Sequence, residues 1–491
     1  EISRRKFLQT LGWSTTALIA FGCGLRSVHS PWQQPNIILM MADDLGWGDV
    51  GFNGNNIIKT PHLDALATGG IKFNRFYSGA PVCSPTRASC LTGRHPLRYG
   101  IWKANTGRLP GQEVTIPAEL KNRGYRTGHF GKWHLGVPNA EYDGKGGGKK
   151  NYCFPEWFGY DMHFITHHSI PTYNPFGPDG EKARTTGNPY FLNGKRVLEN
   201  ITGDDSQIIM DRVIPFIKDA ARQSTPFLTV IWFHAPHKPV KAGSEYKAIY
   251  ADYTYKEQNY YGCITAMDDQ IGRLISELRA EGVEDNTMLW FCSDNGPESG
   301  PGVTGDYRGR KRSLFSGGVG VPAFLHWPGH KLSGRVTEMP CSTLDYLPTI
   351  FAHLDIDMPD DRPLDGINLM PMISGSTEHR AGIIPFRFNV PQGKDFSSPR
   401  ISFIKGQYRY YTDLSQTGDE DLLFDVVEDR SETENIINSD PQLAEELRKE
   451  ANLFIQSAKR SHSGADYNDP YFEPIDDWKE IGRKRKRNKD K

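Results

Sequence analysis

Four apolar segments of the chain share one pattern, in which a short run of hydrophobic residues stops abruptly at a polar cluster. The runs cover residues 36–41, 125–130, 227–233 and 288–292. They lead into Asp43-Asp44, Gly131-Lys132-Trp133-His134, His234-Ala235-Pro236-His237 and Asp294-Asn295, in that order. Continuous apolar runs of this length are typical of strands that are buried on both faces of a parallel sheet. We therefore predict that the four segments are strands of one such sheet.

Helical periodicity fills the intervals between these strands. Residues 116–123, 205–221 and 260–280 precede the second, third and fourth strand, and apolar residues of the last segment recur at helical spacing. Alternating helix and strand predicts an α/β domain with right-handed crossovers. Because ligands bind beyond the carboxyl ends of the strands in such sheets, we expect the four polar clusters to converge on one crevice.

The pattern changes after about residue 375. Short strand candidates at residues 401–404, 408–411 and 422–425 are separated by turns, and residues 441–459 read as an amphipathic helix. This predicts a smaller C-terminal α+β domain with an antiparallel sheet. With 491 residues, the chain is also longer than a single core usually supports. We expect a catalytic domain over residues 32–375, the smaller domain over 376–470 and a basic tail over 471–491.

The N-terminal residues 1–31 have the features of an export signal. Ser3-Arg4-Arg5-Lys6-Phe7-Leu8 precedes an uncharged, moderately apolar stretch, which resembles a twin-arginine (Tat) signal. Several polar residues make this stretch a poor membrane anchor. Ala20-Phe21-Gly22-Cys23 is similar to a lipobox but lacks the usual Leu, so lipidation of Cys23 stays open. We predict export to the periplasm or cell envelope through the export machinery.

Composition narrows the class of protein. Hydrophobic content of 37% and charged content of 24% are typical of a folded soluble protein. The seven cysteines include no CxxC pair, which argues against a disulfide framework, a zinc knuckle and a thioredoxin-type site. Residues 483–491 hold seven Lys or Arg and one Asp. We interpret them as a solvated tail and expect no nucleic-acid partner.

The polar clusters admit several interpretations when each is taken alone. Cys83, four residues before Arg87, could be a thiolate nucleophile with a lowered pKa or an inert structural cysteine. An Asp-Asp pair after a strand is often a helix cap or a solvated turn. Taken together, Asp43, Asp44, Asp294 and Asn295 offer three carboxylates and one amide. Such hard oxygen ligands prefer calcium or magnesium to zinc.

One motif carries a close resemblance to a known family. Cys83-Ser84-Pro85-Thr86-Arg87, followed by Leu91-Thr92-Gly93-Arg94, resembles the signature of the type I formylglycine-dependent sulfatases of the alkaline phosphatase superfamily. This family includes bacterial exported polysaccharide and aryl sulfatases. The resemblance extends over roughly residues 35–440. It implies an alkaline-phosphatase-like fold, with a mostly parallel central sheet sandwiched by helices.

The resemblance also implies the nucleophile and the cofactor. In this family a maturation enzyme oxidises the signature cysteine, here Cys83, to Cα-formylglycine. The hydrated aldehyde carries two hydroxyls, one to attack sulfur and one to expel sulfate afterwards. By match to the family, the metal ligands are Asp43, Asp44, Cys83, Asp294 and Asn295. They would hold one Ca²⁺, with Mg²⁺ as the less favoured ion, to polarise a sulfate oxygen.

Further catalytic residues follow from the same match, residue by residue. Arg87 would hold the diol, Lys132 would bind a sulfate oxygen and His134 would orient the nucleophilic hydroxyl. His237, in Pro236-His237-Lys238-Pro239, matches the histidine on the sulfate side. Lys311, in Arg308-Gly309-Arg310-Lys311, would neutralise the leaving oxygen, alone or with His237 as proton donor. We interpret His234 as a supporting or core residue.

Two segments bear on the substrate. Residues 316–322 have Ser and Gly where members of the family often carry Glu and Arg, which affects loop packing and substrate fit. Residues 151–176 are rich in aromatic and His residues, and they form either a loop with its own small core or a wall of the substrate pocket. Because sugar rings stack on aromatic side chains, we favour a sulfated glycan as substrate, with aryl sulfates as the simpler class.

Other functions fit part of the pattern. A formylglycine-dependent phosphonate or phosphodiester hydrolase would share most of these motifs. A two-metal zinc phosphatase would need additional His or Asp ligands, which we do not find. A non-catalytic, envelope-anchored glycan-binding protein with a decayed site is a different class. The presence of every motif residue argues against such decay.

Overall fold

The computed structural model of the protein describes residues 34–105, 107–139, 151–388, 400–412 and 421–475. The chain divides into Glu1–Pro35 and Asn36–Lys491, and every element described below belongs to the second unit. The predicted export signal at 1–31, including Cys23, and residues 476–491 of the basic tail lie outside the described residues. The described part contains no helix with the length and apolar character needed to cross a membrane.

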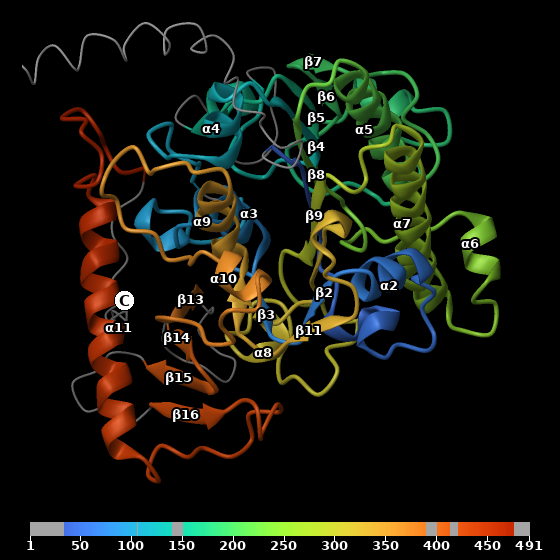
Figure 1. The fold of residues 1–491 in the computed structure, drawn as a ribbon. Coiled ribbons are helices and arrows are strands. Elements are labelled where there is room, and N and C mark those ends of the chain that lie inside the picture. Colours follow the sequence, from blue (N-terminus) through green and yellow to red (C-terminus); the bar gives the residue numbers. More distant parts are fainter. Residues whose placement is uncertain (1–33, 106, 140–150, 389–399, 413–420, 476–491) are drawn as a thin grey trace, which may run out of the picture. The chain divides into compact units, whose positions relative to one another are not determined.

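A ten-stranded, mostly parallel sheet forms the centre of this unit (Figure 1). In spatial order its strands are β11 (Arg335–Thr337), β2 (Ile71–Phe73), β10 (Phe324–His326), β9 (Thr287–Ser293), β1 (Asn36–Ala42), β8 (Phe227–Trp232), β4 (Arg126–Lys132), β5 (Met162–Thr166), β6 (Phe191–Leu192) and β7 (Lys195–Arg196). The five strands from β9 to β5 pair in parallel, whereas β10, β6 and β7 are antiparallel to their neighbours. The four predicted strands are β1, β4, β8 and β9, and they are contiguous in the sheet.

Helices cover both faces of the sheet (Figure 1). One layer contains α2 (Pro61–Thr68), α5 (Asp205–Arg222) and α7 (Tyr255–Ala280), and the other contains α3 (Cys83–Thr92), α4 (Ile116–Asn122) and α9 (Tyr346–His353). Along β1, Ile37 and Leu39 pack into the second layer, and Ile38 and Met40 pack into the first. Burial on both faces explains why this strand is apolar from its second residue onward. The predicted α/β fold, with a central sheet between helices, is confirmed.

Helix α7 begins five residues before the predicted start at Tyr260. Thr254 caps it, with the Glu257 backbone N–H donating to the threonine hydroxyl and the Glu257 side chain accepting from the Thr254 backbone. This capping box satisfies donors that the first turn leaves unpaired. The apolar periodicity starts later, so it marks the buried part of the helix and not its N-terminus.

A separate four-stranded antiparallel sheet lies in the C-terminal part of the chain. It comprises β13 (Ile384–Phe388), β14 (Arg400–Lys405), β15 (Tyr408–Thr412) and β16 (Leu422–Asp425), and α11 (Pro441–His462) packs against it. This confirms the predicted small antiparallel sheet. Strand β13 is an addition to the prediction, because its Pro385 argues against a strand except at a sheet edge, which is where β13 lies. The boundary between residues 375 and 376 stays a prediction.

Shorter elements connect these parts. They are β3 (Phe76–Tyr77) paired with β12 (Cys341–Ser342), the helices α6 (Ser244–Ala248), α8 (Ser316–Val319) and α10 (Met370–Ile373), and 3-10 turns at Trp47–Asp49, Gly51–Asn53, Pro96–Arg98, Pro155–Phe158, Glu181–Arg184, Pro328–His330 and Thr343–Asp345. The six described cysteines are all buried and unpaired.

Candidate active site

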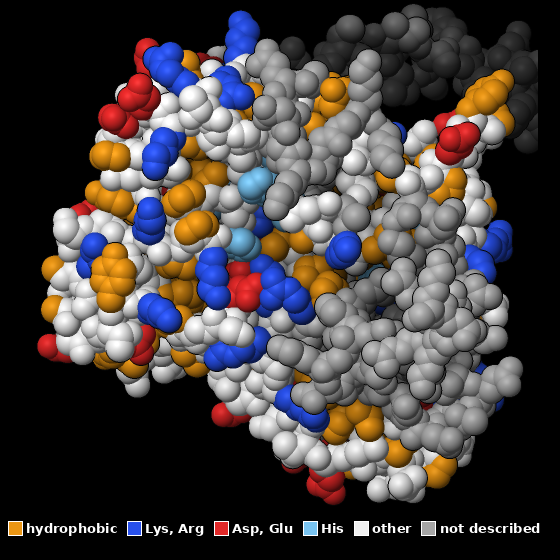
Figure 2. Space-filling view, turned by 180° about the vertical axis from the view of Figure 1, so that it is seen from behind, with side chains coloured by type: hydrophobic (Ala, Val, Ile, Leu, Met, Phe, Trp, Pro, Cys, Tyr) orange, Lys and Arg blue, Asp and Glu red, His pale blue; other side chains and the backbone are white. Residues whose placement is uncertain are grey.

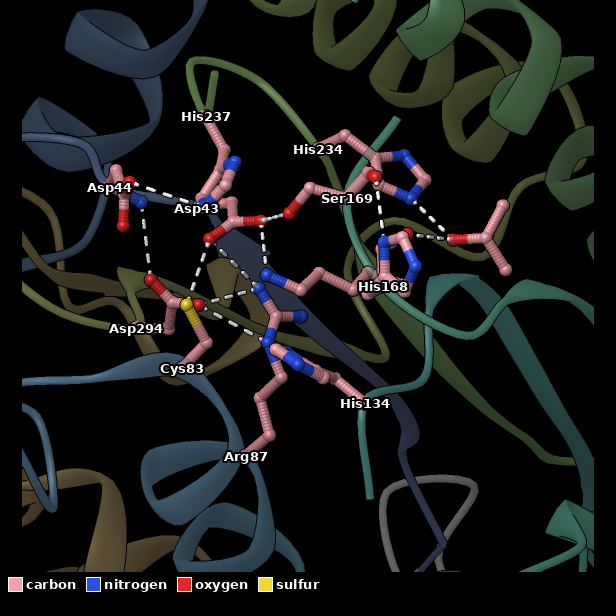
Figure 3. Close-up of polar contacts among 12 residues, drawn as sticks. Asp43, Asp44, Cys83, Arg87, His134, His168, Ser169, His234, His237 and Asp294 are labelled. Atoms are coloured by element: carbon pink, nitrogen blue, oxygen red, sulfur yellow. Dashed lines mark hydrogen bonds and ion pairs between the residues drawn. The ribbon is translucent and has the colours of Figure 1, made fainter. Parts of the chain in front are cut away.

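The polar clusters that follow the central strands meet at one place (Figure 3). This is expected, because the carboxyl ends of parallel strands lie at the same edge of the sheet. Asp43 and Asp44 come directly after β1, Lys132 ends β4, and Asp294 comes directly after β9. Cys83 is the first residue of α3, and its side chain points into the same cluster. Residues separated by up to 267 positions, such as Asp44 and Lys311, are therefore in direct contact.

Cys83 is buried beside the acidic residues. Its Sγ lies 3.4 Å from Oδ1 of Asp43. Burial, together with the charge of Asp294, raises the pKa of the Cys83 thiol above its usual range. An unmodified Cys83 is therefore a neutral thiol in this setting. The interpretation of Cys83 as a thiolate with a lowered pKa is not supported.

Arg87 follows Cys83 by one helical turn and reaches the carboxylate at the end of β9. Its Nε and Nη2 donate to the same oxygen of Asp294, Oδ2, at 3.1 and 2.6 Å. Nη2 also lies 3.6 Å from Oδ1 of Asp43. The remaining nitrogen, Nη1, is buried without a hydrogen-bond partner among the described residues. One donor of a buried guanidinium thus stays available to a ligand.

Two lysines each contact one carboxylate of the Asp-Asp pair. Nζ of Lys132 lies 2.6 Å from Oδ2 of Asp43, and Nζ of Lys311 lies 2.6 and 2.8 Å from the two oxygens of Asp44. Burial opposes ionisation of Asp43, but Lys132 and the other cations hold its pKa well below the usual range. For Asp44, burial outweighs Lys311, and its pKa is raised.

The donor set matches the requirements of a hard cation. Oδ1 of Asn295 is buried without a donor among the described residues, while its Nδ2 donates to Oδ1 of Asp44 at 2.7 Å. Burial and the charge of Asp43 raise the pKa of Asp294 to about 6, which reflects carboxylates crowded together. Ligand atoms of Asp43, Asp44, Cys83 and His237 all lie within 4.8 Å of one another. A cation here would relieve the repulsion and satisfy the orphaned amide oxygen.

Two histidines border the cluster, and both are neutral at pH 7. Nε2 of His134 lies 2.8 Å from Oδ1 of Asn105, and burial lowers the pKa of His134 well below its usual value. His237 presents Nε2 at 3.6 Å from Oδ2 of Asp44, and burial lowers its pKa to about 4. Its Nδ1 lies 2.6 Å from the carbonyl oxygen of Lys238 and therefore carries the proton. Nε2 is then an acceptor.

The backbone at this edge is strained at two site residues. Asp44 has φ +66° and His134 has φ +58°, in the left-handed region that non-glycine residues rarely adopt. Each such residue costs about 1–3 kcal/mol and persists only where the surrounding structure compensates. Here the compensation includes the Lys311–Asp44 and Asn105–His134 contacts.

Sequence reasoning missed Ser169 as a site residue. Its Oγ donates to Oδ2 of Asp43 at 3.1 Å, and the neighbouring His168 faces the same cavity. Both lie in the loop that follows β5. Like the other polar clusters, this loop comes directly after the carboxyl end of a parallel strand. Elsewhere in residues 151–176, Phe158 and Tyr160 are buried in the hydrophobic core. The stretch is thus part core and part cavity wall.

His234 lies outside the cluster and supports this loop. Its Nδ1 lies 2.7 Å from Oδ2 of Asp205, and its Nε2 lies 2.7 Å from Oγ1 of Thr166. Thr166 in turn donates to the carbonyl oxygen of His168. The hydrogen bonds that run from Asp205 through His234 and Thr166 to His168 hold the loop that carries Ser169. Figure 3 shows His234, His168 and Ser169 in this arrangement.

A cavity of about 570 Å³ opens above the cluster. Cys83, His134, His237 and Lys311 line it, together with the further basic residues Lys103, Lys238 and Arg312. Figure 2 shows Lys and Arg side chains gathered around acidic and His side chains on this face of the protein. The arrangement suits an anionic ligand whose charged group reaches the cluster.

The Ser- and Gly-rich segment at 316–322 packs against the loop that carries Lys311. A Cβ on Gly317 would lie 2.2 Å from the carbonyl oxygen of Gly309, and one on Gly318 would lie 2.1 Å from that of Ser313. Glycine is therefore required for this close packing of two backbones. The backbone N–H of Ser316 donates at 2.7 Å to Glu432, a buried residue near the C-terminal sheet.

Comparison with known proteins agrees with this geometry. Residues 35–356 match the family described as Sulfatase. Human N-acetylgalactosamine-6-sulfatase is 34% identical over 385 residues, covering 74% of this chain and 70% of the human protein. Bovine arylsulfatase A is 30% identical over 478 residues and covers 88% of each chain. The crystal structure of Ps i-CgsB in complex with k-i-k-neocarrahexaose superposes with a TM-score of 0.76 at 28% identity, covering 87% of this chain and 94% of that one.

Proposed function

This chain belongs to the sulfatase family and is a hydrolase of sulfate esters, and we propose that it releases sulfate from a sulfated carbohydrate by means of formylglycine at position 83. One observation carries the proposal. The signature cysteine is the first residue of α3, and its Sγ lies 3.4 Å from Asp43 inside a cluster of oxygen ligands. Sγ of the unmodified Cys83 marks the place that the nucleophilic oxygen of hydrated formylglycine would take in the mature enzyme.

The proposed cofactor is one Ca²⁺. Asp43, Asp44, Asp294 and Asn295 would hold it, together with the oxygen that replaces Sγ of Cys83. Three carboxylates and an amide oxygen form a ligand set for Ca²⁺ or Mg²⁺ and not for zinc. When bound, the ion supplies positive charge that polarises a sulfate oxygen and lowers the pKa of the nucleophilic hydroxyl.

The basic side chains then have separate tasks. Arg87 keeps its contact with Asp294 and directs the unpaired Nη1 at the nucleophile. Lys132, which contacts Asp43 at 2.6 Å, and Lys311, which contacts Asp44 at 2.6 Å, are released from these contacts to bind the sulfate and the leaving oxygen. A positive charge next to the leaving oxygen stabilises the negative charge that develops there in the transition state. This stabilisation is largest in a buried site from which water is excluded.

The histidines act as neutral groups. His134, which Asn105 holds at 2.8 Å, orients the nucleophilic hydroxyl and accepts its proton. Nε2 of His237 faces Asp44 and contacts the sulfate side, and its low pKa makes Lys311 the better proton donor to the leaving oxygen at neutral pH. A neutral His237 also keeps the site less positive, which favours a monoanionic ester.

The relatives and the cavity support the proposed substrate class. One relative is named N-acetylgalactosamine-6-sulfatase, and one similar structure is a complex with k-i-k-neocarrahexaose. The basic walls at Lys103, Lys238 and Arg312 suit an anionic glycan. A formylglycine-dependent phosphonate or phosphodiester hydrolase remains the second candidate. Contacts among the motif residues, such as Lys132 with Asp43 and Lys311 with Asp44, argue against the non-catalytic glycan-binding alternative.

We further propose that the enzyme is exported to the periplasm or cell envelope, since the sequence of residues 1–31 supports a Tat signal with an optional lipid anchor at Cys23. The working enzyme would need a formylglycine-generating partner before export. A fusion of residues 1–31 to a reporter that is active only after Tat export tests this. Loss of export in an Arg4→Lys, Arg5→Lys variant is the expected result.

The function is tested by co-expression with a formylglycine-generating enzyme. Tryptic mass spectrometry should find formylglycine at position 83 and at no other cysteine, and Cys83→Ala should abolish turnover while the fold is retained. The matured enzyme is then assayed on 4-nitrophenyl sulfate, phosphate and phenylphosphonate, and on sulfated oligosaccharides. An active enzyme with only unmodified thiol at Cys83 would overturn the mechanism. Faster cleavage of the phosphonate than of every sulfate ester would favour the second candidate.

A further inference from the structure

A second cavity, of about 280 Å³, adjoins the catalytic cavity. Lys238 lines both, and its Nζ donates to the carbonyl oxygen of Ser299 at 2.9 Å, so its side chain lies on the boundary between them. Asp44 also lines the second cavity. A ligand in this cavity would therefore lie next to the catalytic cluster, on the far side of Lys238 from Cys83.

The walls of this cavity combine apolar and aromatic surface with charged groups of both signs. Its two carboxylates are already paired with cations, Asp44 with Lys311 at 2.6 Å and Glu298 with Arg312 at 2.5 Å, whereas Lys256 is exposed. Pro236, Val240 and Pro301 provide apolar surface, and Tyr255 and Tyr260 provide aromatic rings. Ligand sites commonly have such walls with a few polar groups that fix orientation. In contrast, the catalytic cavity is lined mainly by charged and polar side chains. The two cavities thus offer different chemistry to two parts of one molecule.

Tyr255 provides an exposed aromatic surface in the second cavity. It is the first residue of α7, it is 71% exposed, and Nζ of Lys247 lies 5.6 Å from its ring centroid. An exposed aromatic ring on a cavity wall offers a flat surface to an apolar face of a ligand. The C–H face of a pyranose ring is such a surface. Lys256 lies next to it and also lines the cavity, where it can meet an anionic substituent.

We propose that the second cavity binds the sugar unit adjacent to the one that carries the scissile sulfate. Its pyranose ring packs on Tyr255, its sulfate or carboxylate substituent pairs with Lys256, and Lys238 contacts the linkage between the two units. The enzyme then prefers an oligosaccharide with a charged neighbouring unit over a sulfated monosaccharide. This inference rests on the proposed sulfated-carbohydrate substrate and adds the unit that decides specificity.

The test compares substrates that differ in whether they reach the second cavity. The probes are 4-nitrophenyl sulfate, N-acetylgalactosamine 6-sulfate, and sulfated di- to hexasaccharides from carrageenan and chondroitin sulfate. For the oligosaccharide with the highest kcat/KM, Tyr255→Ala and Lys256→Ala should each lower kcat/KM by about tenfold, mainly through KM. The loss should be at least about fivefold larger for the oligosaccharide than for 4-nitrophenyl sulfate.

Matched controls are an exposed tyrosine and an exposed lysine outside both cavities. Tyr471, which is 90% exposed, and Lys241 serve as these, and Tyr471→Ala and Lys241→Ala should match the parent enzyme on every probe. Tyr255→Trp should retain most of the oligosaccharide activity, because it keeps an aromatic face. If Tyr255→Ala does not fold, Lys256→Ala alone decides, since an exposed lysine tolerates truncation.

The outcomes separate this inference from the proposed function. No sulfate release by the matured parent enzyme from any ester would overturn the proposed function. Sulfate release from 4-nitrophenyl sulfate or the monosaccharide, but with no preference for any oligosaccharide, would overturn the second sugar site alone. Equal kcat/KM of the parent, Tyr255→Ala and Lys256→Ala on the best oligosaccharide would overturn it as well.

Discussion

Arg87 and Asp294 form a fully buried ion pair that joins the second turn of α3 to the carboxyl end of β9. Two nitrogens of the guanidinium donate to one oxygen of the carboxylate, at 3.1 and 2.6 Å. The pair ties the helix that carries Cys83 to the metal-ligand cluster. Its removal should therefore affect both stability and activity.

Arg87→Ala should lower the free energy of unfolding by about 3–5 kcal/mol, because it leaves a buried carboxylate without its partner. It should also reduce kcat by at least about a hundredfold, through loss of a donor to the nucleophile. Urea unfolding and 4-nitrophenyl sulfate turnover measure the two effects. As a control, the exposed pair Arg273–Asp211 should contribute at most about 1 kcal/mol, measured in Arg273→Ala. An unfolding midpoint of Arg87→Ala equal to that of Arg273→Ala would contradict the buried pair's role.

Bound calcium should stabilise the folded protein, in part because Oδ1 of Asn295 would be one of its ligands. We expect chelation to abolish activity, and Ca²⁺ to restore it better than Zn²⁺. At a free Ca²⁺ concentration of 100 times Kd, folding should gain about 2.7 kcal/mol, which thermal unfolding detects without turnover. Asn295→Leu should lose most of this gain, because the orphaned amide oxygen is removed. The matched control Asp269→Asn alters a more exposed acidic group beside His62 and should keep it. Two tightly bound zinc ions per active chain would refute the assignment.

Sulfate monoesters should be preferred over phosphate monoesters. Two charges from Ca²⁺ and three from Arg87, Lys132 and Lys311 face three carboxylates and the ionised nucleophile, so about one positive charge remains with His237 neutral. That balance suits a monoanion better than the near-dianion of a phosphate monoester. We expect at least about tenfold higher kcat/KM for 4-nitrophenyl sulfate than for 4-nitrophenyl phosphate, or roughly 1.4 kcal/mol. Lys311→Ala should reduce both rates, and a variant that loses only one of them would argue against its contact with the leaving oxygen.

Stability should fall in mild acid, partly because of His95. Its ring is 1% exposed and packs edge-on against Phe454 of α11, with centroids 5.3 Å apart, and burial lowers its pKa to about 3. The unfolded chain binds a proton near the ordinary value of 6.5, whereas the folded chain does not. Stability is therefore complete above about pH 6.5 and falls as the pH drops toward 3, by up to about 1.4 kcal/mol per pH unit.

The variant His95→Asn should flatten this dependence. Asparagine can keep the cap that His95 forms, in which Nδ1 accepts from the backbone N–H of Leu97 at 3.2 Å, but it does not titrate. Urea unfolding between pH 7 and 4 measures the slope. The remaining slope comes from other buried histidines, such as His129, whose pKa burial also lowers to about 3. An identical pH dependence in the variant and the parent would show that His95 does not contribute.

Some of the tertiary structure was predictable because it follows from local pattern. Strands β1, β8 and β9 are buried on both faces and have unmistakable apolar runs, whereas the largely buried β4 carries Arg126, Thr127 and His129. The polar residues that follow these strands must lie at one edge of a parallel sheet. Short strands such as β2, β10 and β6 have only two or three residues and no comparable pattern. They are stabilised by pairing with neighbours that are distant in sequence.

The sequence by itself determined the chemical groups of the site, the motif around Cys83 and the edge of the sheet where they gather. Tertiary structure alone decided the partners: Lys132 contacts Asp43, Lys311 contacts Asp44, and Ser169 joins them from the loop after β5. The strand order β9-β1-β8-β4-β5 brings these residues together, and it depends on crossover connections that no local pattern specifies. The pKa of each group depends in turn on those neighbours and on burial, because desolvation and nearby charges act through space and not along the chain.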